Sequence, residues 1–321
     1  MTHTKSCVIL GGTGFVGRGL IHALRKRGYE LVVPTRNREM ARELLVIPEL
    51  RLVTADIYDR DTLAGLVRDA DVVINLVGIL NERGHHRGRG FYVAHRDLTA
   101  TLVEVCAAVG VPRLLQMSAL KADAKKGTSD YLKSKGEAED AIRAAGENAP
   151  AWTIFQPSVI FGHDDSFMNR FAQLLRIAPV MPLARANARF APVFVDDVVA
   201  AFCAALDNDT TIGQTYQLCG PRVYSLREIV AYVRDLLGLR RPIIGLPDPI
   251  GRLQARIFDW LPGKPFSTDN FRSLMLHSIC DQNGLLALGI EPTPLEAVAP
   301  AYLQPGGRAD RLDDLRREAN R

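Results

Sequence analysis

A glycine-rich segment directly after the first apolar run most constrains how this 321-residue chain can fold. Residues 7–10 read as a buried strand, and the segment Gly11-Gly12-Thr13-Gly14-Phe15-Val16-Gly17 follows it and opens an amphipathic stretch. Gly11 allows a tight turn, Gly14 lets backbone approach a pyrophosphate, and Gly17 permits close packing of a helix on the strand. The amino end of that helix then offers N–H groups and a favourable dipole to an anion.

The position of the motif, between a strand and a helix, favours a dinucleotide site over a merely structural turn. Within it we expect six residues to contact the nucleotide: Gly11, Thr13, Gly14, Phe15, Val16 and Gly17.

Apolar runs alternate with amphipathic segments along the first half of the chain. The runs predict strands at 7–10, 29–34, 50–54, 72–77 and 113–117, with helices at 16–27, 62–69 and 95–109. The same rhythm returns at 152–155, 193–195 and 215–218. This pattern is typical of a parallel sheet buried on both faces. With right-handed crossovers it predicts a doubly wound, Rossmann-like α/β fold.

The rhythm loosens from about Gly162, where prolines become frequent. We therefore predict a dinucleotide-binding domain over 1–161, to which 190–220 return. Residues 162–189 and 221–305 would form a smaller, interwoven lobe for a substrate or partner, and 306–321 a charged, partly frayed tail. Residues 84–90, rich in glycine, histidine and arginine, predict a flexible basic loop.

Composition excludes several classes of protein. Forty Lys and Arg against 36 Asp and Glu leave a net charge of only +4, too little to predict nucleic-acid binding. The five cysteines are odd in number and scattered, which argues against a disulfide framework or a zinc site and suits a reducing compartment. No run approaches the roughly 18 apolar residues of a membrane span, and Gly11 breaks the first run before it can serve as a secretory signal. We expect a cytoplasmic protein without a metal, and read His163-Asp164-Asp165 as a loop contact.

The end of the second predicted strand bears on which dinucleotide is bound. An NAD site usually places an acidic residue there for the ribose 2′-hydroxyl, but no acid occurs before Glu39. Arg36 and Arg38 could instead clamp a 2′-phosphate, although two solvated arginines would look the same. The sequence therefore favours NADP(H), with NAD(H) as the alternative. Further expected cofactor contacts, at or after strand ends, are Asn37, Asp56 and Ile57 (the last two at the adenine), Leu76, Val77, Gly78, Pro157 and Val159.

Tyr131 and Lys135 form the candidate catalytic pair. Four residues apart, they lie on one face if the segment is helical. A neighbouring ammonium favours phenolate and would bring a phenol pKa of about 10 closer to working pH. Such a tyrosine can exchange a proton with a carbonyl or alcohol while nicotinamide exchanges hydride. A pair with this spacing is common by chance, but its place after the strand 113–117 adds weight.

Taken together, these motifs resemble the extended short-chain dehydrogenase/reductase superfamily, of the NAD-dependent epimerase/dehydratase type. The resemblance spans roughly residues 6–220 and depends on the glycine motif, residues 75–78, the Tyr131/Lys135 pair and the run 156–162. Residues 117–120, the run 157–162 followed by 167–171, and 301–303 look like the branch that contains the nucleotide-binding accessory subunit of respiratory complex I and its bacterial relatives. This resemblance implies bound NADP(H), with Tyr131 and Lys135 beside the nicotinamide ribose. It also implies a structural, assembly or redox-sensing role.

One departure leaves the activity open. Active members carry a Ser or Thr a residue or two beyond the first serine after the fifth strand, and here Ala119 and Leu120 stand there, leaving Ser118. The resemblance to the accessory subunits implies nucleotide binding without turnover. The alternative is an NAD(P)-dependent oxidoreductase or epimerase acting on a carbonyl, quinone-like or nucleotide-sugar substrate. In that case Tyr131 relays the proton, Lys135 orients the ribose and lowers the phenol pKa, and Ser118 completes the set.

Other residues allow a functional and a structural interpretation. Arg170 and Arg189 sit where related nucleotide-sugar enzymes hold substrate phosphates, although exposed arginines are common. Asp196 and Asp197 are polar contacts near the lobe or, more simply, carboxylates at a helix start. Residues 250–261 predict an amphipathic helix that packs on its own domain, or else meets respiratory-chain subunits or a membrane surface. The last option would make the protein peripheral at the inner face of the membrane.

Overall fold

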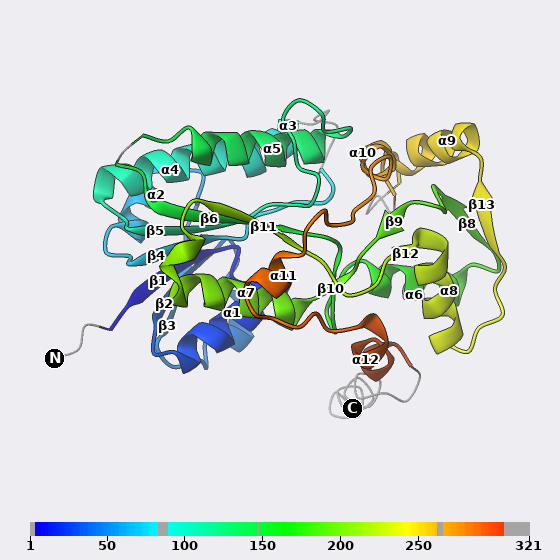
Figure 1. Ribbon diagram of the computed structural model, residues 1–321, viewed down its shortest axis with the longest axis horizontal. Helices are drawn as coiled ribbons and strands as arrows, with labels where there is room; N and C mark the ends of the chain where they lie inside the picture. Colours follow the sequence, from blue (N-terminus) through cyan, green and yellow to red (C-terminus); the bar gives the residue numbers. More distant parts are fainter. Residues whose placement is uncertain (1–3, 83–88, 147, 262–265, 305–321) are drawn as a thin grey trace.

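A seven-stranded parallel sheet organises the computed structural model, which describes residues 4–82, 89–146, 148–261 and 266–304 (Figure 1). The strand order is β11-β6-β5-β4-β1-β2-β3, so the chain reverses direction across the sheet between β1 and β4. In register, Val8 of β1 lies between Val32 of β2 and Val73 of β4. The strands are β1 (Ser6–Leu10), β2 (Glu30–Thr35), β3 (Leu50–Thr54), β4 (Val72–Asn75), β5 (Arg113–Met117), β6 (Ala151–Pro157) and β11 (Gln214–Leu218). The doubly wound, Rossmann-like fold is confirmed.

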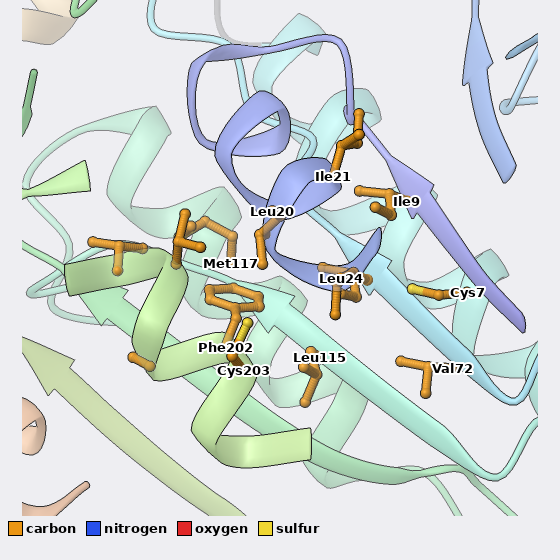
Figure 2. Packing of buried hydrophobic residues seen from close by; sticks show 14 of the residues in the cluster. Cys7, Ile9, Leu20, Ile21, Leu24, Val72, Leu115, Met117, Phe202 and Cys203 are labelled. Carbon is orange, nitrogen blue, oxygen red and sulfur yellow. The ribbon is translucent and has the colours of Figure 1, made fainter. Parts of the chain in front are cut away.

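Helices cover both faces of the sheet. On one face lie α1 (Phe15–Lys26) and α7 (Val195–Asp207); on the other lie α2 (Arg60–Val67), α4 (Leu98–Val109) and α5 (Asp130–Arg143) (Figure 1). Cys7 and Ile9 join the first core, together with Leu20 and Phe202 (Figure 2). Val8 and Leu10 join the second. Successive strand side chains point to opposite faces, so a strand covered on both sides is apolar throughout.

The second lobe has a hydrophobic core of its own, drawn from residues 161–303. Its main elements are α6 (Met168–Ile177), β8 (Met181–Ala184), α8 (Leu226–Leu236), β13 (Ile243–Leu246), α9 (Asp248–Phe258) and α10 (Thr268–Ser273). Shorter elements complete the chain: η1 (Glu39–Leu44), α3 (Arg89–Tyr92), η2 (Val93–Asp97), β7 (Ile160–Phe161), β9 (Arg189–Phe190), β10 (Val193–Phe194), η3 (Asp209–Thr211), β12 (Tyr224–Ser225), α11 (Gly284–Ala287), α12 (Leu295–Val298) and α13 (Pro300–Leu303). The domain boundaries drawn from the sequence stay predictions.

Three predicted elements differ from the structure. The run 193–195 is shortened to β10, which pairs with β7 outside the seven-stranded sheet. The fourth strand ends at Asn75 because the Asn75 side chain accepts a hydrogen bond from the Val77 N–H and turns the chain. The predicted helix 95–109 is divided: η2 is a π-helical turn, and α4 follows it. Residues 84–88 of the predicted basic loop and the whole predicted tail 306–321 lie outside the described residues.

The expectation drawn from the scattered cysteines is wrong at one pair, since Cys219 and Cys280 form a disulfide across a separation of 61 residues. Cys219 directly follows β11 and Cys280 lies between α10 and α11, so the fold brings together two cysteines that sequence spacing does not relate. Cys7, Cys106 and Cys203 are free and buried. Because disulfides persist mainly in oxidising surroundings, cysteine content no longer supports a reducing compartment.

Buried carboxylates in the described part of the chain serve as structural ties. Asp197, in the first turn of α7, accepts hydrogen bonds from the N–H (2.7 Å) and hydroxyl (2.9 Å) of Thr293. Asp165 accepts from the Met168 N–H at 2.6 Å and the Tyr302 hydroxyl at 3.0 Å. No group of three or more metal-ligating side chains occurs among residues the structure describes. In the same part of the chain, every helix is too short or too polar to cross a bilayer.

Candidate functional site

A cavity of about 1000 Å³ runs along the carboxyl edge of the sheet and on into the second lobe. It lies at the point where the strand order reverses, which is where open α/β sheets bind ligands. The residues predicted from the sequence that line it are Gly11, Thr13, Gly14, Phe15, Val16, Gly17, Arg36, Asn37, Ile57, Leu76, Val77, Gly78, Ser118, Tyr131, Lys135, Pro157, Val159 and Arg170.

Asp56, Arg189 and Arg38, the second arginine offered for the 2′-phosphate, are the predicted residues that do not line this cavity. The exposed Asp56 carboxylate accepts a hydrogen bond from the Tyr58 N–H at 3.0 Å, while Ile57 and Tyr58 themselves face the cavity. Arg189 is exposed on β9, where its N–H donates to Nδ1 of His277 at 3.2 Å. The structure therefore does not bring Arg170 and Arg189 together as a clamp on this cavity.

The amino end of α1 is left open to an anion. Gly14 is its N-cap residue, and the first turn has neither a side-chain cap nor an acidic residue. Gly11 has a φ of 75°, which favours glycine, and a Cβ on Gly17 would lie 2.3 Å from the Gly12 carbonyl oxygen. The first N–H groups of a helix have no partner within it and attract negative charge. This end of the cavity is therefore suited to a pyrophosphate.

Arg36 directly follows β2 and lines the cavity. Its exposed guanidinium makes no ion pair with any residue in the described part of the chain. Burial raises the pKa of the neighbouring Tyr58 hydroxyl, and the positive charge of Arg36 opposes that shift. The Asn37 side chain accepts hydrogen bonds from the N–H groups of Glu39 (3.0 Å) and Met40 (3.3 Å). It is thus committed to the turn, and Arg36 is the cation available at this position.

Tyr131 and Lys135 both lie on α5 and face the cavity, as the spacing predicts. The Lys135 ammonium donates to the carbonyl oxygens of Val77 and Met117, each at 3.1 Å, and so ties together the ends of β4 and β5. Burial lowers the pKa of Lys135 to about 8, although Glu139 opposes the shift. The Tyr131 hydroxyl makes no hydrogen bond within the residues described.

The predicted effect of Lys135 on the phenol is wrong for this structure. Burial, and then the Asp269 carboxylate, raise the pKa of Tyr131 to about 12. Asp269 comes from α10, and its oxygens accept the N–H groups of Asp130 (2.7 Å) and Tyr131 (3.3 Å) at the start of α5. The negative charge that anchors this helix therefore works against phenolate formation.

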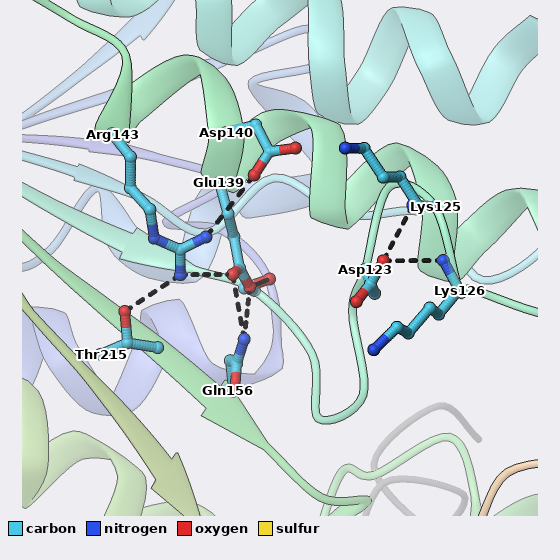
Figure 3. A network of polar contacts seen from close by, with 9 residues as sticks. Asp123, Lys125, Lys126, Glu139, Asp140, Arg143, Gln156 and Thr215 are labelled. Atoms are coloured by element: carbon cyan, nitrogen blue, oxygen red, sulfur yellow. Dashed lines mark hydrogen bonds and ion pairs between the residues drawn. The ribbon is translucent and has the colours of Figure 1, made fainter.

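The Ser118 hydroxyl is hydrogen-bonded elsewhere and does not serve as a third catalytic hydroxyl. Its Oγ donates to the buried Glu139 carboxylate. The same carboxylate accepts from Gln156 (2.7 and 3.0 Å) and Arg143 (2.8 Å) (Figure 3). Ala119 and Leu120 have no hydroxyl. Positions 118–120 therefore leave no hydroxyl free to pair with Tyr131.

His95 is a positioning residue that sequence reasoning missed. Its Nε2 accepts the Ile79 N–H at 3.1 Å, so Nδ1 donates to Ser134 at 2.8 Å, and Ser134 donates to the Tyr131 carbonyl at 2.9 Å. Burial, and then Lys135, lower the pKa of His95 to about 2, so the ring stays neutral. It lies on the π-helical turn, far along the chain from both partners. No local pattern could have identified it.

Nucleotide affinity is expected to fall as the pH rises through about 8, the pKa of Lys135. An anionic nucleotide favours the charged ammonium, so binding is strongest below that pH and weakens as the free protein loses the proton. Titrations with NADPH between about pH 6.5 and pH 9.5 should show this fall, and Lys135→Gln should bind more weakly with a flat profile in that window. An unchanged pH profile in Lys135→Gln would contradict this role for the ammonium.

Comparisons with known proteins agree with this geometry. A model of the "NAD dependent epimerase/dehydratase family" matches residues 7–219. NADH dehydrogenase (ubiquinone) 1 alpha subcomplex subunit 9, mitochondrial, of Arabidopsis thaliana is 30% identical over 302 residues, covering 89% of this chain and 73% of that protein. A ceramide reductase of Caulobacter vibrioides is 31% identical over 251 residues, covering 75% of this chain and 73% of that protein.

Solved structures share the fold at low sequence identity. Pal from Bacillus thuringiensis superposes with a TM-score of 0.74 at 15% identity, covering 93% of this chain and 97% of its own. A UDP-galactose 4-epimerase superposes with a TM-score of 0.69 at 20% identity, covering 97% and 99%. The family model spans most of the chain, and its region contains the glycine motif and the Tyr131/Lys135 pair. This chain belongs to the NAD-dependent epimerase/dehydratase family.

Proposed function

We propose that the protein holds NADP(H) along the carboxyl edge of its sheet without turning it over. The nucleotide then has a structural, assembly or redox-sensing role. The single observation that carries the proposal is the bond between Ser118 and Glu139, which removes the hydroxyl needed beside Tyr131. The raised pKa of Tyr131, about 12, supports the same conclusion because it disfavours the phenolate.

In this proposal each part of the cavity has a defined task. The open end of α1 binds the pyrophosphate, and Arg36, which has no ion pair with a described residue, binds the adenosine 2′-phosphate. Tyr131 and Lys135 contact the nicotinamide ribose, with Pro157 and Val159 at the nicotinamide end. The preference for NADP(H) over NAD(H) depends on Arg36.

The alternative is an active reductase. Two observations favour it: the Tyr131 hydroxyl has no hydrogen bond to a described residue, and the cavity that it lines extends into the second lobe. The Caulobacter relative is named a ceramide reductase. In such a reaction bound NADPH would supply hydride, and Tyr131 would hold and transfer the proton.

Incubation of the NADPH-loaded protein with ketones, quinones and nucleotide sugars separates the two proposals. We expect NADPH to bind stoichiometrically and not to be oxidised. Oxidation is measured as the loss of nicotinamide absorbance. Ala119→Ser, which restores a hydroxyl near the expected position, is the gain-of-function variant. Oxidation by the natural chain that disappears in Tyr131→Phe, with NADPH affinity retained, would overturn the first proposal in favour of the reductase.

The outer face of α9 suggests where the protein resides. Ile250, Leu253 and Ile257, at helical spacing, are 52%, 56% and 54% exposed, and Trp260 just beyond the helix is 80% exposed. The opposite face packs on the lobe through Gly251 and Ala255. The predicted packing of this helix on its own domain accounts for the inner face, and the exposed outer face is the one that a membrane surface or partner would meet. The outer apolar residues Ile250, Leu253, Ile257 and Trp260 are called the α9 stripe below.

Charge beside the α9 stripe is positive. Arg252 and Arg256 are exposed, and neither forms an ion pair with a residue the structure describes. The acids at the two ends are engaged elsewhere: Asp248 pairs with Arg185 at 3.3 Å, and Asp259 accepts from Thr268 at 2.6 and 3.1 Å. An apolar stripe flanked by arginines suits the surface of an anionic bilayer. We therefore propose a peripheral membrane location, and respiratory-chain subunits, suggested by the names of the mitochondrial relatives, as partners.

Sedimentation with lipid vesicles tests the proposed membrane contact. The protein should bind vesicles containing phosphatidylglycerol better than vesicles of phosphatidylcholine alone, and salt should weaken binding. Leu253→Ser together with Ile257→Ser should reduce vesicle affinity at least about tenfold, because two apolar side chains leave the interface. Leu286→Ser, 62% exposed on α11, is the matched control and should have no effect. Equal binding by the double variant and the control would contradict the proposal.

A further inference from the structure

The cavity changes character beyond Tyr131. In the second lobe its walls include Phe171 and Leu174 of α6, Met181 and Leu183 of β8, Phe258 of α9, and Phe266. These six residues define the apolar chamber. It opens directly onto the half of the cavity lined by the glycine motif, Tyr131 and Lys135.

Charge is scarce in this part of the cavity. Among the described lining residues from 166 to 278, Arg170 is the sole charged side chain. Arg189, the second arginine predicted to hold substrate phosphates, lies outside the cavity. A buried diphosphate carries at least two negative charges and needs several cationic or N–H partners. The chamber is therefore a poor receptor for the diphosphate of a nucleotide sugar.

Helix α10 lies against both α9, which contributes Phe258 to the chamber, and α5, which carries Tyr131. Asp269 of α10 binds the N–H groups that begin α5, and Ser273 of α10 donates to Ser129 at 2.8 Å. Asn270 of the same helix donates to the Leu80 carbonyl at 3.3 Å. Helix α10, whose Asn270 and Ser273 also line the cavity, is thus joined by direct hydrogen bonds to the start of the helix that carries Tyr131. Tyr131 lines the same cavity as the six residues of the chamber.

Displacement of water from apolar walls by an apolar ligand is favourable in free energy. We propose that the apolar chamber binds a lipid with one long aliphatic chain, whose small carbonyl or hydroxyl head lies at Tyr131 and whose chain extends between α6 and α9. The inference rests on the proposed function in one respect: a nucleotide in the other half of the cavity confines the lipid to the chamber. It holds whether the lipid is a substrate or a bound ligand.

A homologous series of methyl ketones, titrated calorimetrically into the NADPH-loaded protein, tests the proposal. Each added methylene should tighten binding about fourfold until the chamber is filled, after which the affinity levels off. Leu174→Asn should weaken the longest ketone at least about tenfold while leaving short ketones and NADPH unaffected. Because this substitution could impair folding, Phe258→Ser at the edge of the chamber is the second variant, and Leu286→Ser is the surface control.

The outcomes separate this inference from the proposed function. NADPH binding with no dependence of ketone affinity on chain length, or with unchanged long-chain affinity in both chamber variants, would overturn the chamber proposal alone. Tighter binding of a nucleotide sugar than of any ketone would also overturn it. Chain-length-dependent ketone binding by a folded protein that does not bind NADPH would support the chamber and overturn the proposed function.

Discussion

Replacement of Gly17 by alanine is expected to destabilise the protein by at least about 3 kcal/mol and to abolish nucleotide binding. A Cβ at this position would lie 2.3 Å from the Gly12 carbonyl oxygen and 2.5 Å from the Gly12 Cα. Both contacts are to backbone, so no side-chain rotation can relieve them. Alanine improves helix propensity by only about 1 kcal/mol, which the clash exceeds. Relief must come from shifting α1 away from the turn that binds the pyrophosphate.

Gly65→Ala is the matched control for that substitution. Gly65 also lies inside a helix, α2, but a Cβ there meets no atom within 4 Å. Its replacement should stabilise the protein by roughly 0.5–1 kcal/mol and leave nucleotide affinity unchanged. Chemical denaturation and NADPH titration of both variants provide the comparison. If Gly17→Ala were as stable and bound NADPH as tightly as Gly65→Ala, the assigned role of this turn would be wrong.

Arg36→Ala is expected to weaken NADPH binding by about 10- to 100-fold while NADH binding stays the same. Hydrogen bonds to a charged group contribute about 1.5–3 kcal/mol, which corresponds to that range of affinity. Arg36 lines the cavity and makes no ion pair with a described residue, so its charge is available to a 2′-phosphate. NADH lacks that phosphate and should not be affected.

Arg38→Ala is the control for the loss of one positive charge near the cavity. Arg38 is exposed two residues away but does not line the cavity, so its loss should change NADPH affinity by less than a factor of about three. Fluorescence titration of both nucleotides against both variants measures the difference. A parallel loss of NADPH and NADH affinity in Arg36→Ala would mean that Arg36 does not read the 2′-phosphate.

The parts of the fold with strong local signals could be predicted from the sequence. The central strands β1 and β4 are largely apolar because helices cover both faces of the sheet, and the run 113–117 coincides with β5. The glycine motif is local to one turn, and the spacing of Tyr131 and Lys135 needs only a helix to bring them to one face. The conformation of these elements is determined by residues that are close together in the sequence.

The features that decide the chemistry depend on distant partners, and local sequence could not predict them. Ser118 is turned by Glu139, which lies 21 residues further along the chain. The pKa of Tyr131 is raised by burial and by Asp269, whose carboxylate comes from the second lobe 138 residues away. His95 and the Cys219–Cys280 disulfide likewise join segments with no common pattern. Each contact arises from packing of the completed fold.

Calorimetric titration of the folded chain with NADPH and with NADH tests the central claim most directly. The account predicts one NADPH bound per chain, at least about tenfold tighter than NADH. Folding of the same material is checked by circular dichroism. Absence of binding heat from both coenzymes with folded protein, or equal affinities for the two, would contradict it.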